Sequence, residues 1–396
     1  MSRILISNIG EIFTGDLASP RSPARSIAIA DGRIEAFDPT PSNDYDSVLD
    51  AQGAAVLPGL VDGHVHPVAG EWTPTQNTSG WITSYLHGGS TTLVSAGELH
   101  FPGLDPQKLT PELVTSLAVL GASTAAGAAN VRVRLHAGTA LMVPGMEESH
   151  FQRLADAGSR FIKFLFYPLE TRREECLRYL AWARARGMRA KVHTGGVSRS
   201  GASQICGFAT LQWMRPDIAA HVSGGPIPMC DEDLDALVDR TDMTLEICSS
   251  GNYGSTVRAV RRLAERGELA RLTLGTDTPG GTGIIPRGML RNILLLTSVC
   301  GLAPEVAIAV ASGNTARAHG LDVGILAPGR PADLIVAGPV EGSAGVTLGD
   351  AIAHGDLPGI AYVMVDGRFV VSDRSRQTPP PRYRPVLSGW CRPAGA

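Results

Sequence analysis

Two histidines stand one residue apart, His64 and His66, in the stretch LPGLVDGHVHP that runs from residue 57 to residue 67. The apolar residues before them indicate a buried strand that ends at the histidines. Side chains two positions apart in a strand point to the same side, so both imidazoles face one point while Val65 packs the other way. The pair is therefore predicted to be a bidentate clamp for one metal ion.

Four more polar side chains stand in or at the end of later apolar strands, namely Lys163, His193, His221 and Asp277. Imidazole and carboxylate ligands suit zinc or another divalent transition metal. A lysine ammonium has no lone pair and repels a cation. If carbon dioxide carbamylates Lys163, however, the side chain becomes an anionic oxygen donor that can bridge two metal ions. This favours a binuclear site over a mononuclear one.

Each of these residues also has an ordinary explanation. A single His193 or His221 is more often a satisfied core or surface histidine. Lys163 can lay its stem along apolar surface and carry its head to solvent, and Asp277 in GTDTPGG can cap the start of a following helix. The ordered set across five predicted strands, with the His-X-His pair, favours metal binding over these separate explanations.

Three further residues are candidates for contact with a substrate, namely His100, Thr194 and Arg287. His100 follows the second predicted strand in SAGELHFPG, where a loop-stabilising hydrogen bond is an equal alternative. Thr194 comes directly after a predicted ligand. Arg287 lies in the loop after the last strand and can pair with a substrate carboxylate, although most loop arginines are solvated.

The elements that must position these residues are short apolar strands that alternate with longer helical segments, which favours βαβ units and a parallel sheet. Eight such units in about 260 residues are the expected size of a (β/α)8 barrel. The carboxyl ends of barrel strands form one face, so the six candidate ligands can converge there. The strands are expected in AAVLPGLVDGH, STTLVSAG, VRVRLHAG, RFIKFLFY, MRAKVH, DIAAHV, MTLEIC and LTLGTD, and the clearest helices in EECLRYLAWARARG, DEDLDALVDR and TVRAVRRLAERGELA.

The two ends of the chain have a different pattern from the middle. Residues 1–56 read as a small β-sheet unit, and the same pattern returns after residue 324. There, Asp-Gly between two apolar runs in IAYVMVDGRFVV is a strong hairpin signal. The ends are therefore predicted to complete one sheet domain together, around a catalytic barrel of residues 57–323.

Composition limits the classes of partner. The chain has 396 residues, 43% of them apolar, and a formal net charge of -3 without basic runs. This gives no electrostatic footprint for nucleic acid or an anionic membrane, so the expected partners are small molecules and other copies of the chain. No signal peptide or apolar membrane span is visible. The six cysteines include no close pair, and a reducing cytoplasm fits best.

Several motifs together resemble the amidohydrolase superfamily. They are PGLVDGHVHP, the strand-borne lysine in RFIKFLFY, KVHTGG, AAHVSGG, LGTDTPGG and GILAPGRPADLIV, and they extend over nearly the whole chain. The resemblance implies an α/β fold with a TIM-like (β/α)8 barrel, and a small β-sandwich domain formed by residues 1–56 and 324–396.

The resemblance also implies a distribution of ligands over two divalent metal ions, zinc first and iron or manganese next. His64, His66 and Asp277 would hold the first ion, and His193 and His221 the second. A carbamylated Lys163, as in dihydroorotase and hydantoinase, and a hydroxide would lie between them. Asp277 would accept the proton of the attacking hydroxide and pass it to the leaving nitrogen.

The activity implied is hydrolysis of a cyclic amide, most like an enamide-containing lactam that bears a carboxylate. A hydantoinase-like or dihydroorotase-like activity on other cyclic amides is one alternative. A heterocycle deaminase is another, which would commonly use one metal ion and an unmodified lysine. A non-catalytic assembly protein that has lost its metals is a third. A homotetramer is the oligomeric state that the resemblance suggests.

Overall fold

The computed structural model describes residues 3–40, 42, 44–67, 81–98, 105–127, 132–198, 200–225, 227–280 and 283–389. The chain divides by its contacts into two compact units. The first comprises Met1–Val61, Ile82–Thr91 and Pro286–Ala396, and the second comprises Asp62–Trp81 and Thr92–Ile285. The domain boundaries expected from the sequence, at 56/57 and 323/324, stay a prediction.

Seven of the eight strands predicted for the middle of the chain are present as single strands. The first, AAVLPGLVDGH, is instead divided into β7 (Ala55–Pro58) and β8 (Leu60–Val65), which belong to different sheets. Six strands form one parallel sheet in the order β11-β12-β13-β14-β15-β16, and three form a second sheet in the order β10-β9-β8. The additional member is β11, a two-residue strand that pairs with β12. The bounds are β8 Leu60–Val65, β9 Ser90–Ser95, β10 Arg134–His136, β11 Ala140–Leu141, β12 Phe161–Phe164, β13 Arg189–His193, β14 Ile218–Ala220, β15 Thr244–Cys248 and β16 Leu272–Gly275.

The carboxyl ends of β8 and β16 are joined by backbone hydrogen bonds. Val65 forms a parallel bridge with Thr278. The amide of Asp277 donates to the carbonyl of His64 over 2.8 Å, and the amide of His66 donates to the carbonyl of Thr278 over 2.6 Å. The first and last predicted strands therefore meet at the end where the histidine pair lies.

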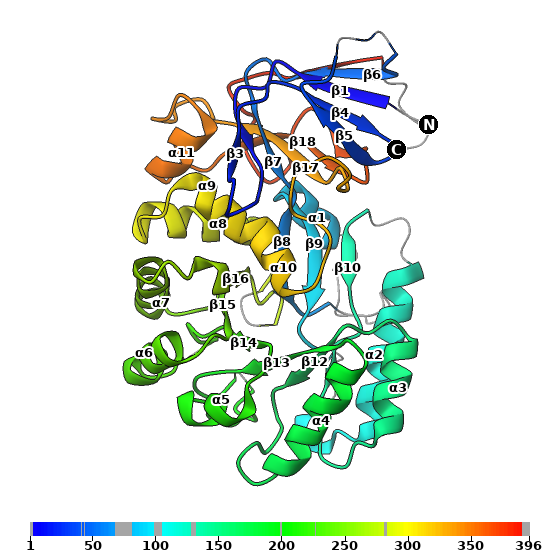
Figure 1. Ribbon diagram of the computed structural model, residues 1–396, viewed down its shortest axis with the longest axis vertical. Coiled ribbons are helices and arrows are strands. Elements are labelled where there is room, and N and C mark those ends of the chain that lie inside the picture. The colour runs from blue at the N-terminus through cyan, green and yellow to red at the C-terminus, as the bar shows by residue number, and fades with distance from the viewer. Residues whose placement is uncertain are drawn as a thin grey trace. The chain divides into compact units, whose positions relative to one another are not determined.

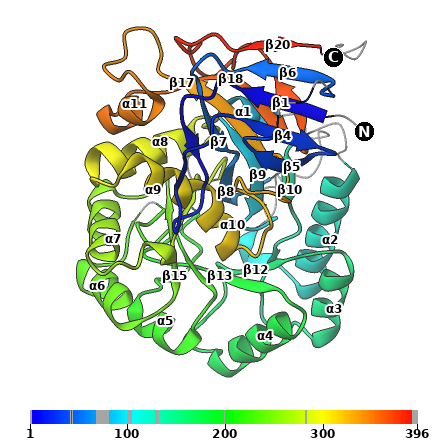
Figure 2. The ribbon, with the colours of Figure 1, turned by 45° about the horizontal axis from the view of Figure 1, so that its top comes forward.

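Helices α2 to α7 form an arc around the strands of the second unit (Figures 1 and 2). The predicted helices in the segments 174–187, 231–240 and 256–270 are confirmed as α4, α6 and α7. The bounds are α2 Pro111–Gly127, α3 Glu148–Asp156, α4 Arg173–Ala185, α5 Phe208–Met214, α6 Asp231–Arg240 and α7 Tyr253–Glu265, with the 3-10 turns η1 Pro106–Lys108 and η2 Leu269–Arg271.

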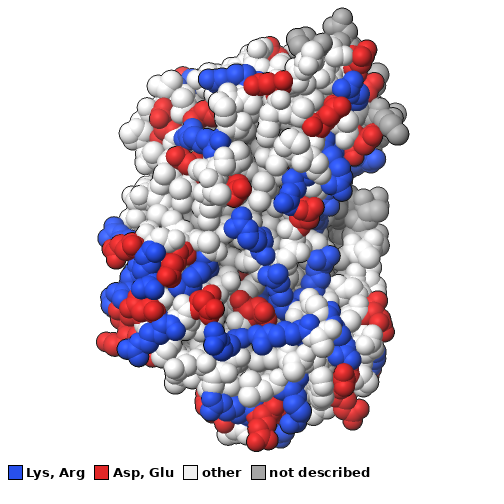
Figure 3. All heavy atoms as spheres, viewed as in Figure 1, with Lys and Arg blue, Asp and Glu red and all other residues white. Residues whose placement is uncertain are grey.

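Charged side chains hold α6 against α7. Arg258 of α7 donates two hydrogen bonds, both over 2.7 Å, to the carboxylate of Asp235 in α6. Arg262, one turn further on, pairs with Asp239. Acidic and basic side chains are interspersed over the face shown in Figure 3. These helices thus present a mixed-charge outer surface, while the opposite side of α7 is apolar.

The pairing of the two chain ends is confirmed. In the first unit, β17 pairs with β7 and β20 pairs with β6, so segments from both ends share two sheets. The sheet orders are β20-β6-β1-β4-β5 and β19-β18-β17-β7-β2-β3. The Asp366-Gly367 hairpin joins β18 to β19, and both turn residues have positive φ. One buried apolar cluster takes residues from both sheets, among them Ile6 and Val336.

The remaining elements have the following bounds. The strands are β1 Arg3–Ser7, β2 Ile12–Phe13, β3 Arg21–Ser22, β4 Ile27–Ala30, β5 Arg33–Phe37, β6 Ser47–Asp50, β7 Ala55–Pro58, β17 Leu334–Gly338, β18 Gly359–Val365, β19 Arg368–Val371 and β20 Val386–Ser388. The helices are α1 Trp81–His87, α8 Gly288–Leu294, η3 Leu295–Val299, α9 Pro304–Ala309, η4 Val310–Asn314, α10 Thr315–Ala318 and α11 Leu348–His354. Within the described residues, no helix combines the length and the apolar character that a membrane crossing requires.

Burial of α7 against the strands makes a testable contribution to stability. Leu263 is fully buried on the inner side of this helix. We expect Leu263→Ala to lower the free energy of unfolding by about 2–5 kcal/mol, because it removes apolar contacts and leaves a cavity. Urea denaturation measures this change. On the same helix, Glu265→Ala at an exposed position should stay within about 0.5 kcal/mol, and equal effects of the two substitutions would contradict the packing described.

Candidate metal centre

The six predicted ligands line one cavity. His64, His66, Lys163, His193, His221 and Asp277 come from five different strands or strand ends of the second unit, and all contribute to a cavity of about 380 Å³. This volume is in the range of small-molecule sites. The convergence expected from the parallel arrangement of the strands is therefore observed.

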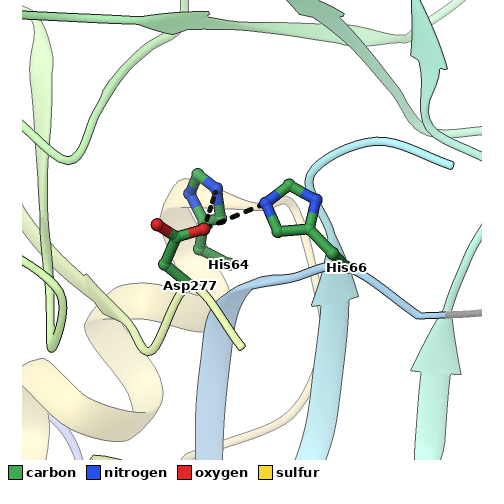
Figure 4. A group of neighbouring side chains, drawn as sticks. All are labelled: His64, His66 and Asp277. Carbon is green, nitrogen blue, oxygen red and sulfur yellow. Dashed lines mark hydrogen bonds and ion pairs between the residues drawn. The ribbon is translucent and has the colours of Figure 1, made fainter. Parts of the chain in front are cut away.

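His64, His66 and Asp277 form the tightest group (Figure 4). The Asp277 Oδ1 atom lies 3.0 Å from His66 Nε2 and 3.5 Å from His64 Nε2. One ligand atom from each of the three residues lies within 4.8 Å of the other two. Two ring nitrogens and a carboxylate oxygen around one point are a donor set that fits a divalent transition metal.

His193 and His221 form a second pair in the same cavity. Their ring centroids are 4.6 Å apart, and the His221 ring is 5.2 Å from that of His64. His193 Nε2 lies 2.9 Å from the carbonyl oxygen of Gly196. His221 Nδ1 is buried and has no hydrogen-bond partner among the residues that the structure describes. A buried nitrogen without a partner costs free energy, which a bound cation would recover.

Lys163 lines the cavity and is buried, with 1% of its surface exposed. Its head therefore does not reach solvent, and Nζ has no hydrogen-bond partner among the described residues. Burial lowers the pKa of Lys163 to about 8. This effect is larger than that of the Glu246 carboxylate, whose negative charge favours the ammonium form and raises the pKa. An uncharged amine is the form that reacts with carbon dioxide. The lowered pKa thus increases the fraction of Lys163 that is uncharged near neutral pH.

The protonation states in the cavity favour cation binding. Burial lowers the pKa of His64 and of His193 to about 4, so both imidazoles are neutral at pH 7 and keep a lone pair. Burial would raise the pKa of Asp277, but the hydrogen bond with His66 and the neighbouring imidazoles hold it well below its usual range. Asp277 is therefore an anion at neutral pH. Neutral histidines and an ionised carboxylate are the ligand forms that metals need.

Two of the six residues have unusual backbone conformations. Asp277 has φ +60° and His221 has φ +41°, in the left-handed region that L-residues seldom adopt. Asp277 is not the cap of the next helix, because α8 begins at Gly288 with Arg287 at its N-cap. Strained conformations of this kind cluster at functional sites, where surrounding contacts enforce them.

The sequence analysis missed three buried ionisable residues in the strands that carry the predicted ligands or in the neighbouring strand β15, namely Glu246, Lys191 and Asp62. Glu246 accepts a hydrogen bond from His64 Nδ1, and its other oxygen lies 3.8 Å from Lys191 Nζ. Asp62 accepts hydrogen bonds from the amide and hydroxyl of Thr276, over 2.9 Å and 2.6 Å. All three interrupt apolar strand sequences, in LVDGH, RAKVH and TLEIC, which is the same signal that identified Lys163.

The three predicted substrate contacts have different positions. Thr194 is fully buried, its hydroxyl donates to the carbonyl of Ala220 over 2.9 Å, and it is not among the residues that line the cavity. Arg287 is exposed at the start of α8 and belongs to the other compact unit. His100 lies outside the described residues. A substrate contact by any of the three stays a prediction.

The rest of the cavity wall is partly apolar and partly hydroxylic. Pro106, Leu141, Leu165 and Phe166 contribute apolar surface, while serines contribute hydroxyl groups. Ser250 Oγ donates to Asp277 Oδ2 over 3.1 Å, so it holds the second oxygen of that carboxylate. An apolar wall with a few polar groups is typical of a pocket for a small organic molecule.

The cavity and the similarity to known proteins together identify a metal-dependent hydrolase of the TIM-barrel class. The Amidohydrolase family model matches residues 209–370. The chain belongs to the amidohydrolase family and is a hydrolase of C-N bonds. It is similar to the enamidase of Eubacterium barkeri, with 37% identity over 96% of this chain and 98% of the relative. The crystal structure of an enamidase superposes with a TM-score of 0.90 at 36% identity, over 98% of this chain and 100% of that one.

Other relatives are less similar to this chain in sequence. The adenine deaminase of Ruegeria pomeroyi is 24% identical over 91% of this chain, but over only 56% of the deaminase. The structure of N-acetyl-D-glucosamine-6-phosphate deacetylase from Mycobacterium smegmatis has a TM-score of 0.62 at 19% identity, over 94% of this chain and 100% of the deacetylase chain. The second likeness shows a common fold.

The low pKa of His193 predicts how acid affects the metal-free protein. In the unfolded chain this histidine binds a proton below about pH 6.5, whereas in the folded chain it does so only below about pH 4. Unfolding therefore takes up a proton in this window, and stability falls as the pH decreases from 6.5 to 4, by about 3 kcal/mol for this residue. Denaturation of metal-free wild type and His193→Asn across these pH values should give a shallower slope for the variant; parallel slopes would contradict the shift.

Proposed function

We propose that the protein hydrolyses the amide bond of a cyclic enamide, a lactam such as 6-oxo-1,4,5,6-tetrahydronicotinate. The observation that carries the proposal is the convergence of four histidines, a buried lysine and an aspartate on one cavity. The near full-length similarity to an enamidase, at 37% identity, supports the substrate class. The partly apolar cavity wall suits a small ring.

The six lining residues are proposed to hold two divalent metal ions. His64, His66 and Asp277 would hold the first ion, and His193 and His221 the second, with Lys163 between them. Bound there, two such ions lower the pKa of water toward about 7 and polarise an amide carbonyl. Zinc is the proposed metal, and iron or manganese would suit the same donors. A closed (β/α)8 barrel and a β-sandwich built from the chain ends complete the proposed architecture.

Lys163 is proposed to be carbamylated. In that step the lone pair of the neutral Nζ attacks the carbon of carbon dioxide, an N-C bond forms as one C=O π bond opens, and the nitrogen releases one proton to water. The product is an anion with two oxygen donors, in place of a cation that would repel metal ions. Burial of Nζ without a hydrogen-bond partner among the described residues supports this assignment.

Asp277 is proposed to transfer a proton from the attacking water to the leaving ring nitrogen. Its carboxylate is ionised and is held by His66 on one oxygen and Ser250 on the other. It can accept a proton from the attacking water and deliver it to the leaving ring nitrogen. The released enamine then becomes an imine, and a second water converts it to an aldehyde and ammonia.

Ammonia release tests the proposed reaction. Purified protein supplied with metal should release ammonia and an aldehyde in equal amounts from 6-oxo-1,4,5,6-tetrahydronicotinate. His64→Ala should release neither at a measurable rate, because the first metal loses a ligand. The saturated lactam 6-oxopiperidine-3-carboxylate is the matched substrate control, since its opening leaves nitrogen attached to carbon. Turnover of hydantoins or dihydropyrimidines alone would reject the enamide substrate and retain a cyclic amidohydrolase.

Replacement of Lys163 tests the carbamate. We expect Lys163→Ala to lose more than about 100-fold in activity, beyond the 10–100-fold typical of outer-shell partners, because a ligand itself is removed. NMR spectra recorded with 13C-bicarbonate should show a carbamate carbon in wild type that the variant lacks. Added propionate should restore part of the variant's activity. Lys108→Ala, at a lysine whose side chain is 82% exposed, is the control; a carbamate signal that survives in Lys163→Ala would contradict the assignment.

A heterocycle deaminase is the second candidate, because adenine deaminases are among the relatives that span most of the chain. A deaminase would release ammonia without an aldehyde and would be expected to work with about one metal ion per chain and an unmodified Lys163. Metal analysis of the pure protein, together with the aldehyde measurement, separates the two. The cytoplasmic location and the homotetramer expected from the sequence remain part of the proposal.

A further inference from the structure

The His64 ring is hydrogen-bonded through Nδ1 to a buried carboxylate, on the side of the ring opposite Nε2. Glu246, in the middle of β15, accepts a hydrogen bond from His64 Nδ1, and the exposed fractions of the two side chains are 0% and 1%. Because the Nδ1 proton points to Glu246, the other ring nitrogen, Nε2, keeps its lone pair. That nitrogen lies 3.5 Å from Asp277 Oδ1. Two lone pairs that face each other in a buried site repel unless a cation lies between them.

A lysine balances the charge of this carboxylate. Lys191 Nζ lies 3.8 Å from Glu246 Oε2, and it also donates a hydrogen bond to the carbonyl oxygen of Gly63. Both side chains are fully buried. Gly63 immediately precedes His64, so Lys191 contacts both the carboxylate and the strand that carries the histidine. The three residues come from three strands, β8, β13 and β15.

We infer that Glu246 is a positioning residue for the first metal ion, and that Lys191 holds Glu246 in place. Glu246 fixes the ring orientation and tautomer of His64, so that Nε2 faces the point shared with His66 and Asp277. A carboxylate on the far nitrogen also makes an imidazole a stronger ligand. The inference rests on the proposed metal site, since it assigns a role to residues that touch neither the substrate nor the metal.

Zinc affinity tests the inference without measuring activity. Metal-free protein is titrated with Zn2+ in competition with a chromophoric chelator, and the two binding steps are resolved. We expect Glu246→Gln to weaken one of the two steps by about 10–100-fold, the usual effect of losing such a partner, and to leave the other step unchanged. Cys248→Ala is the matched control, because Cys248 is buried on the same strand with Sγ 3.8 Å from Glu246 Oε1, and it should bind zinc as wild type does.

If Glu246→Gln fails to fold because Lys191 loses its partner charge, a double variant can be used for the same zinc titration. Glu246→Leu with Lys191→Met removes both charges together, and replacement of a buried ion pair by apolar residues is often tolerated. This variant should fold without metal, as circular dichroism and urea denaturation will show, and should have the same weakened step. Wild-type zinc affinity in a folded variant would overturn the inference and leave a purely structural ion pair. Failure of the wild type to bind zinc would instead reject the proposed metal site.

Discussion

The parallel direction of the strands is the constraint on which the site depends. Parallel strands bring their carboxyl ends to one edge, so residues as distant in sequence as His66 and Asp277, 211 positions apart, come within 3.0 Å. The helices that return the chain lie outside the strands, as α7 does with its apolar side inward. A helix that failed to pack would therefore disturb the register of the neighbouring strands, and with it the ligand geometry.

Burial of charge is the second constraint, and it explains why the polar residues occur as a network. Each ionised group under the cavity would be unstable alone in apolar surroundings. Glu246 is therefore balanced by Lys191, while burial keeps His64 and His193 neutral. Lys163 and the Nδ1 atom of His221 remain unsatisfied within the described residues. These two atoms are the ones for which the proposed metal ions and carbamate would supply a partner.

Comparison with the relatives distinguishes properties of the fold, which many enzymes share, from substrate specificity, which depends on the residues of the site. A deacetylase with 19% identity has the same fold at a TM-score of 0.62, and this likeness carries no information on substrate. The enamidase structure superposes at 0.90 with 36% identity, which supports a closer relation in chemistry. Leu141, Phe166 and the serines line the cavity beside the six predicted ligands. Measurements of activity in solution are therefore most informative about the class of substrate.

The sequence by itself determined the alternation of strands and helices, the pairing of the chain ends, and the candidate ligands at strand ends. The alternation and the ligand positions depend on local periodicity, as in the pair His64 and His66 with the two-residue repeat of a strand, while the chain ends were matched by the strand pattern that both of them share. Only the tertiary structure decided that Glu246 lies behind His64, because that contact joins strands 182 positions apart. It likewise decided that the Thr194 hydroxyl bonds to the neighbouring strand. Which side chains meet depends on the register between strands, and no local pattern in the chain encodes that register.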